Sequence, residues 1–244
     1  MNINIIIPVL NEQDSIFEKI SSAVNFLNST PLKNLYCLTI IDNGSTDNTQ
    51  AIATSLVNQF NNIVYYVHLN ERGVGLAFRE GIKNNSFDIV GYMDLDLATD
   101  LNHVIDVYNT FITNKDASIV VGSRLLKSSK VIGRSLIRTI TSVGLNTILK
   151  VFLGVKFSDA MCGFKFYRKE IAEKLMNECS NNNGWFYCAE MMIRAEWLNI
   201  HINEIPVVWT DDPNSKVKIF KLIINYLKDI FYLRKEKKNY FKSH

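Results

Sequence analysis

Two carboxylates, Asp94 and Asp96, follow an apolar run that extends from residue 87 to residue 93. Hard divalent cations such as Mg²⁺ and Mn²⁺ bind a few carboxylates together with substrate phosphates. Two acidic side chains, two positions apart at the end of a buried strand, could therefore hold one cation that also contacts a phosphate of a ligand. A lone pair of this kind is weak evidence, because loops are rich in aspartate for turn and capping reasons.

A second group of reactive side chains is basic. Residues 117–158 contain no acidic residue but carry Arg124, Lys127, Lys130, Arg134, Arg138, Lys150 and Lys156. Residues 216–244 have a net charge of +7, whereas residues 1–215 have a net charge of −4. An acid-free segment after a metal-binding strand favours an anionic partner. No nucleic-acid reader motif is present, and the acidity of residues 1–215 argues against nucleic acid as that partner.

Strands that alternate with helices must position these residues. Hydrophobic periodicity predicts strands at 4–10, 35–41, 63–69, 87–93, 117–121 and 200–208, an extended segment at 160–167, and a turn at 211–215. It predicts helices at 16–27, 49–60, 76–84, 101–114, 131–153, 185–198 and 220–231. The alternation indicates an α/β fold with a mostly parallel sheet and right-handed crossovers, whose ligands bind beyond the carboxyl ends of the strands.

Composition is that of an ordinary globular protein, with 244 residues, 47% hydrophobic and 21% charged. The four cysteines lack metal-ligand spacing, which favours reduced, mostly buried thiols and a cytosolic compartment. We expect no signal peptide and no membrane-spanning run, hence a soluble or peripheral protein. The two basic amphipathic helices, at 131–153 and near the C-terminus, fit either packing on the sheet or the surface of an anionic membrane, which we favour. We divide the chain into one α/β domain at 1–215 and a basic amphipathic helix and tail at 216–244.

Three other polar positions have two readings each. The loop 70–75 is rich in glycine, but a dinucleotide motif would require glycine or alanine where Phe78 stands. Arg72 beside this flexible backbone suits a phosphate equally well. Asp42 fits a turn or a hydrogen bond to a base or ribose, and Glu12 fits a helix N-terminal charge or a ligand contact.

The motifs at successive strand ends form an ordered set: Pro8-Val-Leu-Asn-Glu12, Asp42-Asn-Gly-Ser-Thr-Asp47, Arg72-Gly-Val-Gly-Leu-Ala77 and Asp94-Leu-Asp96. Together they resemble family 2 glycosyltransferases. Three later motifs, Gly122-Ser-Arg124, Asp159-Ala-Met-Cys-Gly-Phe-Lys165 and Trp209-Thr-Asp-Asp-Pro-Asn-Ser-Lys216, resemble the branch that makes polyprenyl-phosphate sugars, especially the dolichyl-phosphate glucosyltransferases. The resemblance covers about residues 3–235, and the ordered set is far more specific than any single motif.

The resemblance implies a GT-A fold and a set of site residues. A nucleotide sugar would be surrounded by Pro8, Asn11, Glu12, Asp42, Arg72 and Asp94. The metal, Mg²⁺ or Mn²⁺, would be held with the diphosphate by Asp94 and Asp96. The phosphate of a lipid acceptor would be held by Arg124, Arg138, Ser142 and Lys216, the last on a C-terminal loop. Asp94, Asp96, Arg124 and Arg138 would be the catalytic residues.

Two departures from the mannose-transferring relatives favour the glucose branch. Those relatives usually carry a ligand such as Gln where Ala98 stands, and an Arg where this chain has the pair Asp211 and Asp212. A third protein ligand for the metal is therefore in doubt.

We predict an inverting, metal-dependent enzyme that moves glucose from UDP-glucose to a polyprenyl phosphate at the cytoplasmic face of a membrane. The alternatives are a GDP-mannose-dependent polyprenyl-phosphate mannosyltransferase, a family 2 transferase for a hydroxyl acceptor with Glu190 as base, and a non-catalytic membrane-bound nucleotide-sugar-binding protein. For Glu190, we favour a non-catalytic position on a helix surface. A nucleotidyltransferase is disfavoured, because its Gly-rich basic loop would stand where Pro8-Val-Leu-Asn-Glu12 does. The sugar, the base, the lipid and the oligomeric state stay open.

Overall fold

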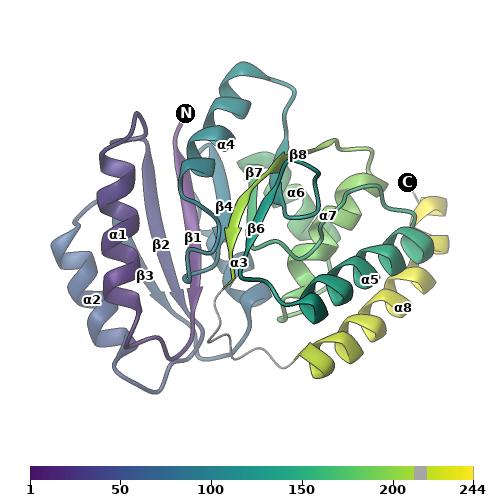
Figure 1. The fold of residues 1–244 in the computed structure, drawn as a ribbon, viewed down its shortest axis with the longest axis horizontal. Helices are drawn as coiled ribbons and strands as arrows, with labels where there is room; N and C mark the ends of the chain where they lie inside the picture. Colours follow the sequence, from purple (N-terminus) through teal and green to yellow (C-terminus); the bar gives the residue numbers. More distant parts are fainter. Residues whose placement is uncertain (212–218, 244) are drawn as a thin grey trace.

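Seven strands form the central sheet in a computed structural model that describes residues 1–211 and 219–243. The strands are β1 (Ile3–Val9), β2 (Tyr36–Asp42), β3 (Val64–His68), β4 (Ile89–Met93), β5 (Ile119–Ser123), β7 (Phe164–Arg168) and β8 (Ile202–Pro206). They are ordered β3-β2-β1-β4-β7-β5-β8 across the sheet (Figure 1). Six strands run in one direction, and β7 is antiparallel to its neighbours β4 and β5.

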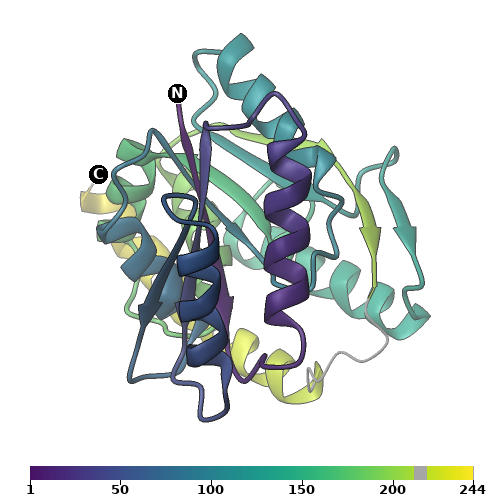
Figure 2. The ribbon, with the colours of Figure 1, turned by 90° about the vertical axis from the view of Figure 1, so that its left-hand side faces the viewer.

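Helices cover both faces of this sheet. One face is covered by α1 (Ile16–Asn28), α2 (Thr49–Gln59) and α4 (Asn102–Thr113), and the other by α3 (Val74–Lys83), α6 (Lys169–Glu178) and α7 (Phe186–Trp197). Figure 2 shows α1 and α2 side by side on their face. Successive side chains of a strand point to opposite faces, so Ile5 and Ile7 of β1 pack on the α1 side and Ile6 on the α3 side. This double burial explains why β1 is a continuous apolar run.

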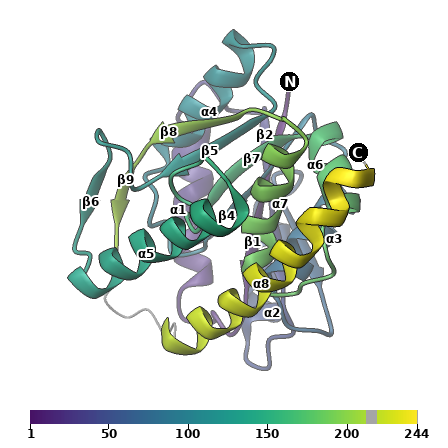
Figure 3. The same cartoon turned by 90° about the vertical axis from the view of Figure 1, so that its right-hand side faces the viewer.

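Two further helices, α5 (Leu136–Leu153) and α8 (Ile219–Ser243), lie next to each other outside α7 (Figure 3). The rings of Phe152 and Phe231 meet edge to face at 5.7 Å. The buried side chains of α8, Tyr226, Ile230 and Leu233, join the same core cluster as Leu145, Leu149 and Leu153 of α5. The described part of α8 is therefore packed against the body of the protein.

The segment 131–153, predicted to be one helix, is divided in two. Residues Lys130–Ile132 form β6, which pairs in parallel with β9 (Val208–Thr210), and the helix begins only at Leu136. Gly133 adopts a φ of +74°, and the Ser135 hydroxyl accepts a hydrogen bond from the Arg138 backbone N–H as a helix cap. The structure also adds α6, which the periodicity did not indicate.

Among the described residues, one helix, α5, is long and apolar enough to cross a membrane by length and composition. It has 18 residues and a mean hydropathy of 1.4, so our expectation that no run reaches this length was wrong. Its inner side contributes buried leucines to the core, whereas Leu136, Ile137 and Ile140 on its outer side are 66–80% exposed.

The direction of the strands gathers several loops at one edge of the sheet, which we call the carboxyl edge. The parallel strands β1, β2, β3, β4 and β5 all end there. Because β7 runs the opposite way, its amino end and the preceding residues 159–163 lie at the same edge. The candidate site is built at this edge.

Candidate active site

Asp94 is the first residue after β4, and its carboxylate is held from two sides. The Tyr92 phenol donates a hydrogen bond to Oδ1 of Asp94. On the other side stands Gly163, where a Cβ atom would lie only 1.8 Å from Oδ2 of Asp94. Asp96 is exposed, and its Oδ1 accepts a hydrogen bond of 3.0 Å from the backbone N–H of Ala98. Asp94 is thus fixed in the wall of the site, and Asp96 stands at its surface.

Burial, and next the neighbouring charge of Asp96, raise the pKa of the Asp94 carboxyl to about 6. Opposing these effects are the Tyr92 hydrogen bond and the cations Lys165 and Arg124. Two carboxylates that repel each other at a strand end fit a divalent cation, which would relieve the repulsion. Among the described residues no group of three or more His, Cys, Asp or Glu side chains could hold a metal. The two aspartates would therefore share the cation with phosphate oxygens and water.

Arg124 follows β5 and makes a two-pronged ion pair with Asp159. Its Nε and Nη2 donate to the two carboxylate oxygens at 2.7 and 2.9 Å, and its backbone N–H donates to Oδ2 at 3.1 Å. The two side chains are 8% and 0% exposed. Burial alone would raise the pKa of Asp159, but Arg124 lowers it to about 2. The guanidinium also stacks on the ring of Trp209, 4.8 Å from its centroid.

Arg138 and Ser142, the other predicted acceptor ligands, lie on the first turns of α5. Nη1 of Arg138 donates to both carboxylate oxygens of Asp211 at 2.7 Å. The Ser142 hydroxyl accepts a hydrogen bond from Nη2 of Arg134. The structure thus brings Arg124, Arg138 and Ser142 to one region, whereas Lys216 lies outside the described residues.

The predicted nucleotide loop after β1 is joined to the loop after β2. Asn11, in the left-handed region with φ of 54°, donates from its backbone to the Ser45 hydroxyl at 2.9 Å and accepts from the Thr46 N–H at 2.8 Å. The Glu12 N–H donates to the Thr49 hydroxyl at 2.8 Å. Pro8 lies within β1 opposite Ile41 of β2. These bonds hold the two loops together as one surface at the carboxyl edge.

Asp42 closes β2 and is fully buried. Its Oδ1 accepts from the Ser45 N–H at 2.8 Å, and its Oδ2 accepts from the Tyr66 phenol at 2.9 Å and lies 3.4 Å from Nδ1 of His68. The adjacent Asn43 is 3% exposed, and its Oδ1 has no partner among the described residues. Asp42 therefore organises the β2 and β3 ends, and the amide oxygen of Asn43 is left for another donor.

The glycine loop after β3 packs on the segment before α7. A Cβ at Gly73 or Gly75 would meet the backbone of residues 182–184 within 3 Å, so neither position accepts a side chain without a shift. Arg79 of α3 donates to the carbonyl of Asn182 at 2.6 Å and to the side chain of Asn183. Arg72 is exposed at the same loop.

Glu190, the reserve candidate for a base, is buried inside α7 and does not lie on a helix surface. Its exposed fraction is 1%, and its carboxylate accepts from the N–H and hydroxyl of Ser180 and from Arg194. Those contacts give Glu190 a structural role.

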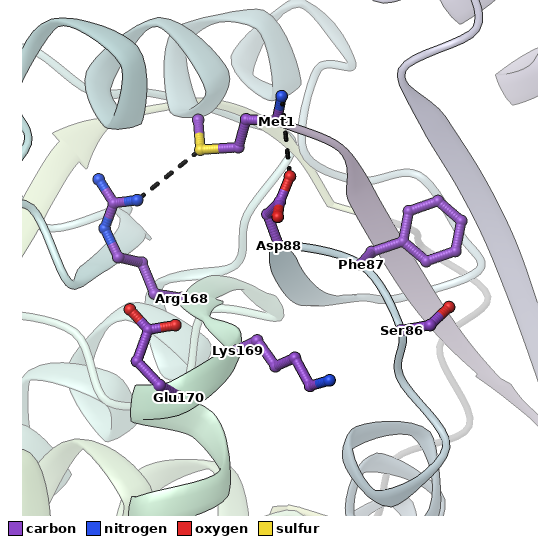
Figure 4. A pocket seen from close by; sticks show the side chains of 7 residues that line it. All are labelled: Met1, Ser86, Phe87, Asp88, Arg168, Lys169 and Glu170. Carbon is purple, nitrogen blue, oxygen red and sulfur yellow. Dashed lines mark hydrogen bonds and ion pairs between the residues drawn. The ribbon is translucent and has the colours of Figure 1, made fainter.

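Two hollows open on the surface of the described residues, and the first lies away from the candidate site. One of about 470 Å³ lies at the opposite edge of the sheet, where the Met1 amine is 3.7 Å from Asp88 and Arg168 points toward the Met1 sulfur (Figure 4). Arg168 also donates to the carbonyls of Ala117, Phe111 and Lys115, which ties it to the fold. The second, of about 300 Å³, lies between residues 182–186 and α8, with Tyr226 in its wall.

Several residues of the site were not predicted from the sequence as functional. They are Tyr92, Asp159, Gly163 and Arg134. Asp159 and Gly163 belong to the motif at residues 159–165, but their contacts with Arg124 and Asp94 depend on the antiparallel placement of β7. The acid-free character of residues 117–158 was the signal that could have singled out Arg134.

Comparison with known proteins identifies the family of the chain. The profile of "Glycosyl transferase family 2" matches residues 4–176. A dolichyl-phosphate beta-glucosyltransferase from Dictyostelium discoideum is 32% identical over 242 residues, covering 95% of this chain and 73% of that protein. Another, from Saccharomyces cerevisiae, is 26% identical over 95% of this chain and 74% of its own length.

A solved structure supports the fold. Glucosyl-3-phosphoglycerate synthase from Mycobacterium tuberculosis, in complex with Mn²⁺ and UDP-glucose, has a TM-score of 0.65 and 17% identity, covering 94% of this chain and 78% of that one. The same enzyme in complex with UDP has a TM-score of 0.67. These neighbours confirm the predicted GT-A fold. Since the family profile spans most of the chain, the protein belongs to glycosyl transferase family 2 and is a glycosyltransferase.

Proposed function

We propose that the protein transfers glucose from UDP-glucose to the phosphate of a polyprenyl-phosphate lipid, with inversion at the anomeric carbon. The observation that carries the proposal is the carboxylate pair Asp94 and Asp96 at the same edge of the sheet as an arginine-rich, acid-free segment. The names of the relatives, dolichyl-phosphate beta-glucosyltransferases that match nearly the whole chain, support glucose and a polyprenyl phosphate. UDP-glucose is the donor that we expect for glucose.

On the donor side, Asp94 and Asp96 would hold Mg²⁺ or Mn²⁺, which when bound supplies Lewis-acid stabilisation of the diphosphate leaving group. Tyr92 and Gly163 fix the direction of the Asp94 carboxylate. Pro8, Asn11, Glu12, Asp42 and Arg72 are proposed to surround the nucleotide. The bonds between the loops after β1 and β2 keep this surface in place before the donor arrives.

On the acceptor side, a phosphate monoester is already ionised at neutral pH, so no strong general base is needed. Arg124, Arg138, Ser142 and Lys216 are proposed to orient it. Its oxygen attacks the anomeric carbon of glucose as the bond from that carbon to the diphosphate breaks, and UDP leaves. Asp159 keeps the Arg124 guanidinium in one direction through two hydrogen bonds. A hydroxyl acceptor is disfavoured, because Glu190 is engaged by Ser180 and Arg194.

The membrane that carries the lipid is proposed to contact the outer side of α5. We define the α5 outer face by Leu136, Ile137, Ile140 and Val143, which are 48–80% exposed. The adjoining β6 exposes Val131 and Ile132, and Lys127, Lys130 and Lys150 are exposed nearby. Apolar side chains beside basic ones suit the surface of an anionic bilayer. Arg138 starts the same helix, so this orientation would bring the lipid phosphate to the acceptor side of the site, at the cytoplasmic face.

The test is a transfer assay with the purified full chain, Mg²⁺ or Mn²⁺, and a short polyprenyl phosphate. Radiolabelled UDP-glucose, GDP-mannose and other nucleotide sugars are supplied singly, and labelled lipid is separated from free sugar. We expect labelled lipid with UDP-glucose, and its loss in the double variant D94N/D96N. Product only with GDP-mannose would overturn the choice of donor, and no lipid product with any donor would overturn the proposed reaction.

A further inference from the structure

Three arginines of the acid-free segment lie close enough to influence one another electrostatically. They are Arg124, Arg134 and Arg138, and the positive charges of Arg124 and Arg138 both act on Arg134. Arg124 is neutralised by Asp159 and Arg138 by Asp211, each through two hydrogen bonds to a carboxylate. Their positive charge is thus already balanced inside the chain.

Arg134 differs from the other two, because its hydrogen-bond acceptors among the described residues are neutral. Its Nη2 donates to the Ser142 hydroxyl and to the Arg138 carbonyl at 3.3 Å. Its Nε is buried and has no hydrogen-bond partner among the described residues. Burial, and next the charge of Arg124, lower the pKa of Arg134, and the charges of Asp159 and Asp211 oppose this shift only in part. A buried donor left unpaired and a cation close to other cations are both unfavourable, and among the described residues no carboxylate forms a hydrogen bond with this guanidinium.

We infer that Arg134, which donates a hydrogen bond to the Ser142 hydroxyl, is the arginine that neutralises the phosphate of the acceptor. This inference rests on the proposed function and adds a residue to it. A lipid phosphate at neutral pH carries up to two negative charges, and the fork of N–H groups on a guanidinium matches its oxygens. Arg124 and Arg138 orient the acceptor through those N–H groups that are not hydrogen-bonded to Asp159 or Asp211. Arg134 supplies a positive charge that is not hydrogen-bonded to a carboxylate of the described residues.

The inference is tested by separating acceptor binding from donor binding. With Mn²⁺, UDP-glucose and farnesyl phosphate as a short acceptor, KM is measured for each substrate in the wild type, R134Q and R134K. We expect KM for farnesyl phosphate to rise at least about tenfold in R134Q and less in R134K, which keeps the charge without the fork. KM for UDP-glucose should stay within about twofold of wild type. The single-charge control is K174Q, on the exposed side of α6, with both KM values unchanged.

Thermal unfolding supplies a second readout that does not need turnover. We expect farnesyl phosphate or inorganic phosphate to raise the Tm of the wild type and of K174Q but not of R134Q. Without ligand, R134Q should melt at or above the wild-type temperature, since it removes an unbalanced charge. A lower Tm with both KM values raised equally would assign Arg134 a structural role and overturn the inference, as would an unchanged KM for farnesyl phosphate.

The two readouts distinguish this inference from the proposed function. If the wild type transfers glucose and R134Q does so with an unchanged KM for the acceptor, only the inference fails. If no donor yields a glycolipid, the proposed function fails, while phosphate stabilisation that disappears in R134Q still supports an anion site at Arg134.

Discussion

The phenol of Tyr92 donates a hydrogen bond to Oδ1 of Asp94, two residues further along the same strand end. This bond opposes the burial and the Asp96 charge that raise the pKa of Asp94 to about 6. Below that pH, the folded protein without bound metal carries Asp94 in its neutral form, so protons compete with the cation for this carboxyl. Activity should therefore fall as the pH is lowered through about 6.

Replacing Tyr92 with phenylalanine removes the hydrogen bond that favours the charged carboxylate. The pKa of Asp94 should rise, by roughly half a pH unit to one pH unit for a bond of about 1 kcal/mol. The acid limb of the pH profile of kcat/KM for the donor should move upward by the same amount. Y36F is the control, because Tyr36 lies at the amino end of β2, away from the carboxyl edge. This variant should keep the acid limb of the wild-type pH profile. An unmoved limb in Y92F would show that the bond does not control this titration.

The position of Gly163 leaves no space for a methyl group. A Cβ there would lie 1.8 Å from Oδ2 of Asp94, so G163A must displace the carboxylate or the backbone. We expect a loss of about 1–3 kcal/mol in the free energy of unfolding, together with at least about tenfold weaker Mn²⁺ binding in the presence of UDP. Titration calorimetry and urea unfolding measure the two effects.

The matched control for this substitution is G144A, on the open side of α5, where nothing lies within 4 Å of an added Cβ. Alanine in a helix interior should stabilise the protein by about 0.5–1 kcal/mol and leave Mn²⁺ binding unchanged. Equal Mn²⁺ affinity in G163A and wild type would refute the proposed support of Asp94 by Gly163.

Much of the carboxyl edge of the sheet was predictable from local sequence patterns. The apolar runs gave the parallel strands to within a few residues, and Asp42, Asp94 and Arg124 stand directly at or after strand ends as expected. These predictions succeed because a buried strand needs a continuous apolar run and a polar exit, both local properties.

The contacts of the site were less predictable, because they join segments far apart in the chain. The extended segment at 160–167 was recognised, but nothing local indicated that β7 enters antiparallel between β4 and β5. That placement brings Gly163 to Asp94 and Asp159 to Arg124. The helix expected at 131–153 starts late because Gly133 and Ser135 interrupt a pattern that hydrophobic spacing alone would continue. Which arginine is left without a carboxylate depends on these pairings.

Asp159 provides the counter-charge of the buried Arg124 guanidinium. Removing the charge of Asp159 should therefore strongly destabilise the folded protein. D159N leaves the guanidinium, 8% exposed, without its counter-charge, and we expect a loss of about 3–5 kcal/mol in the free energy of unfolding at pH 7. Because Arg124 lowers the pKa of Asp159 to about 2, its contribution is present above the ordinary value near 3.8 and is lost as the pH falls toward 2.

Urea unfolding of the wild type and D159N should therefore show a difference that narrows below about pH 4. D116N, at an exposed loop residue, should change stability by less than about 0.5 kcal/mol. A difference for D159N as small as that for D116N would mean that Arg124 is rehydrated in the variant and that the ion pair does not hold this part of the edge.

The α5 outer face can be tested without disturbing the core. I137D and I140D change side chains that are 66% and 70% exposed, so folding should be retained, whereas each charge should weaken binding to vesicles of anionic lipid by about tenfold or more. Flotation measures the bound fraction, and I112D on α4, at a side chain 49% exposed, is the control.

We also expect deletion of residues 216–244 to reduce flotation. That deletion removes Tyr226, Ile230 and Leu233 from the core, so the point substitutions are more informative. Transfer to soluble farnesyl phosphate should persist in I137D and I140D, because these side chains lie outside the proposed acceptor ligands. Transfer to a long polyprenyl phosphate in vesicles should fall with the bound fraction. If both variants float like the wild type, or if I112D loses binding equally, the membrane does not contact the outer side of α5.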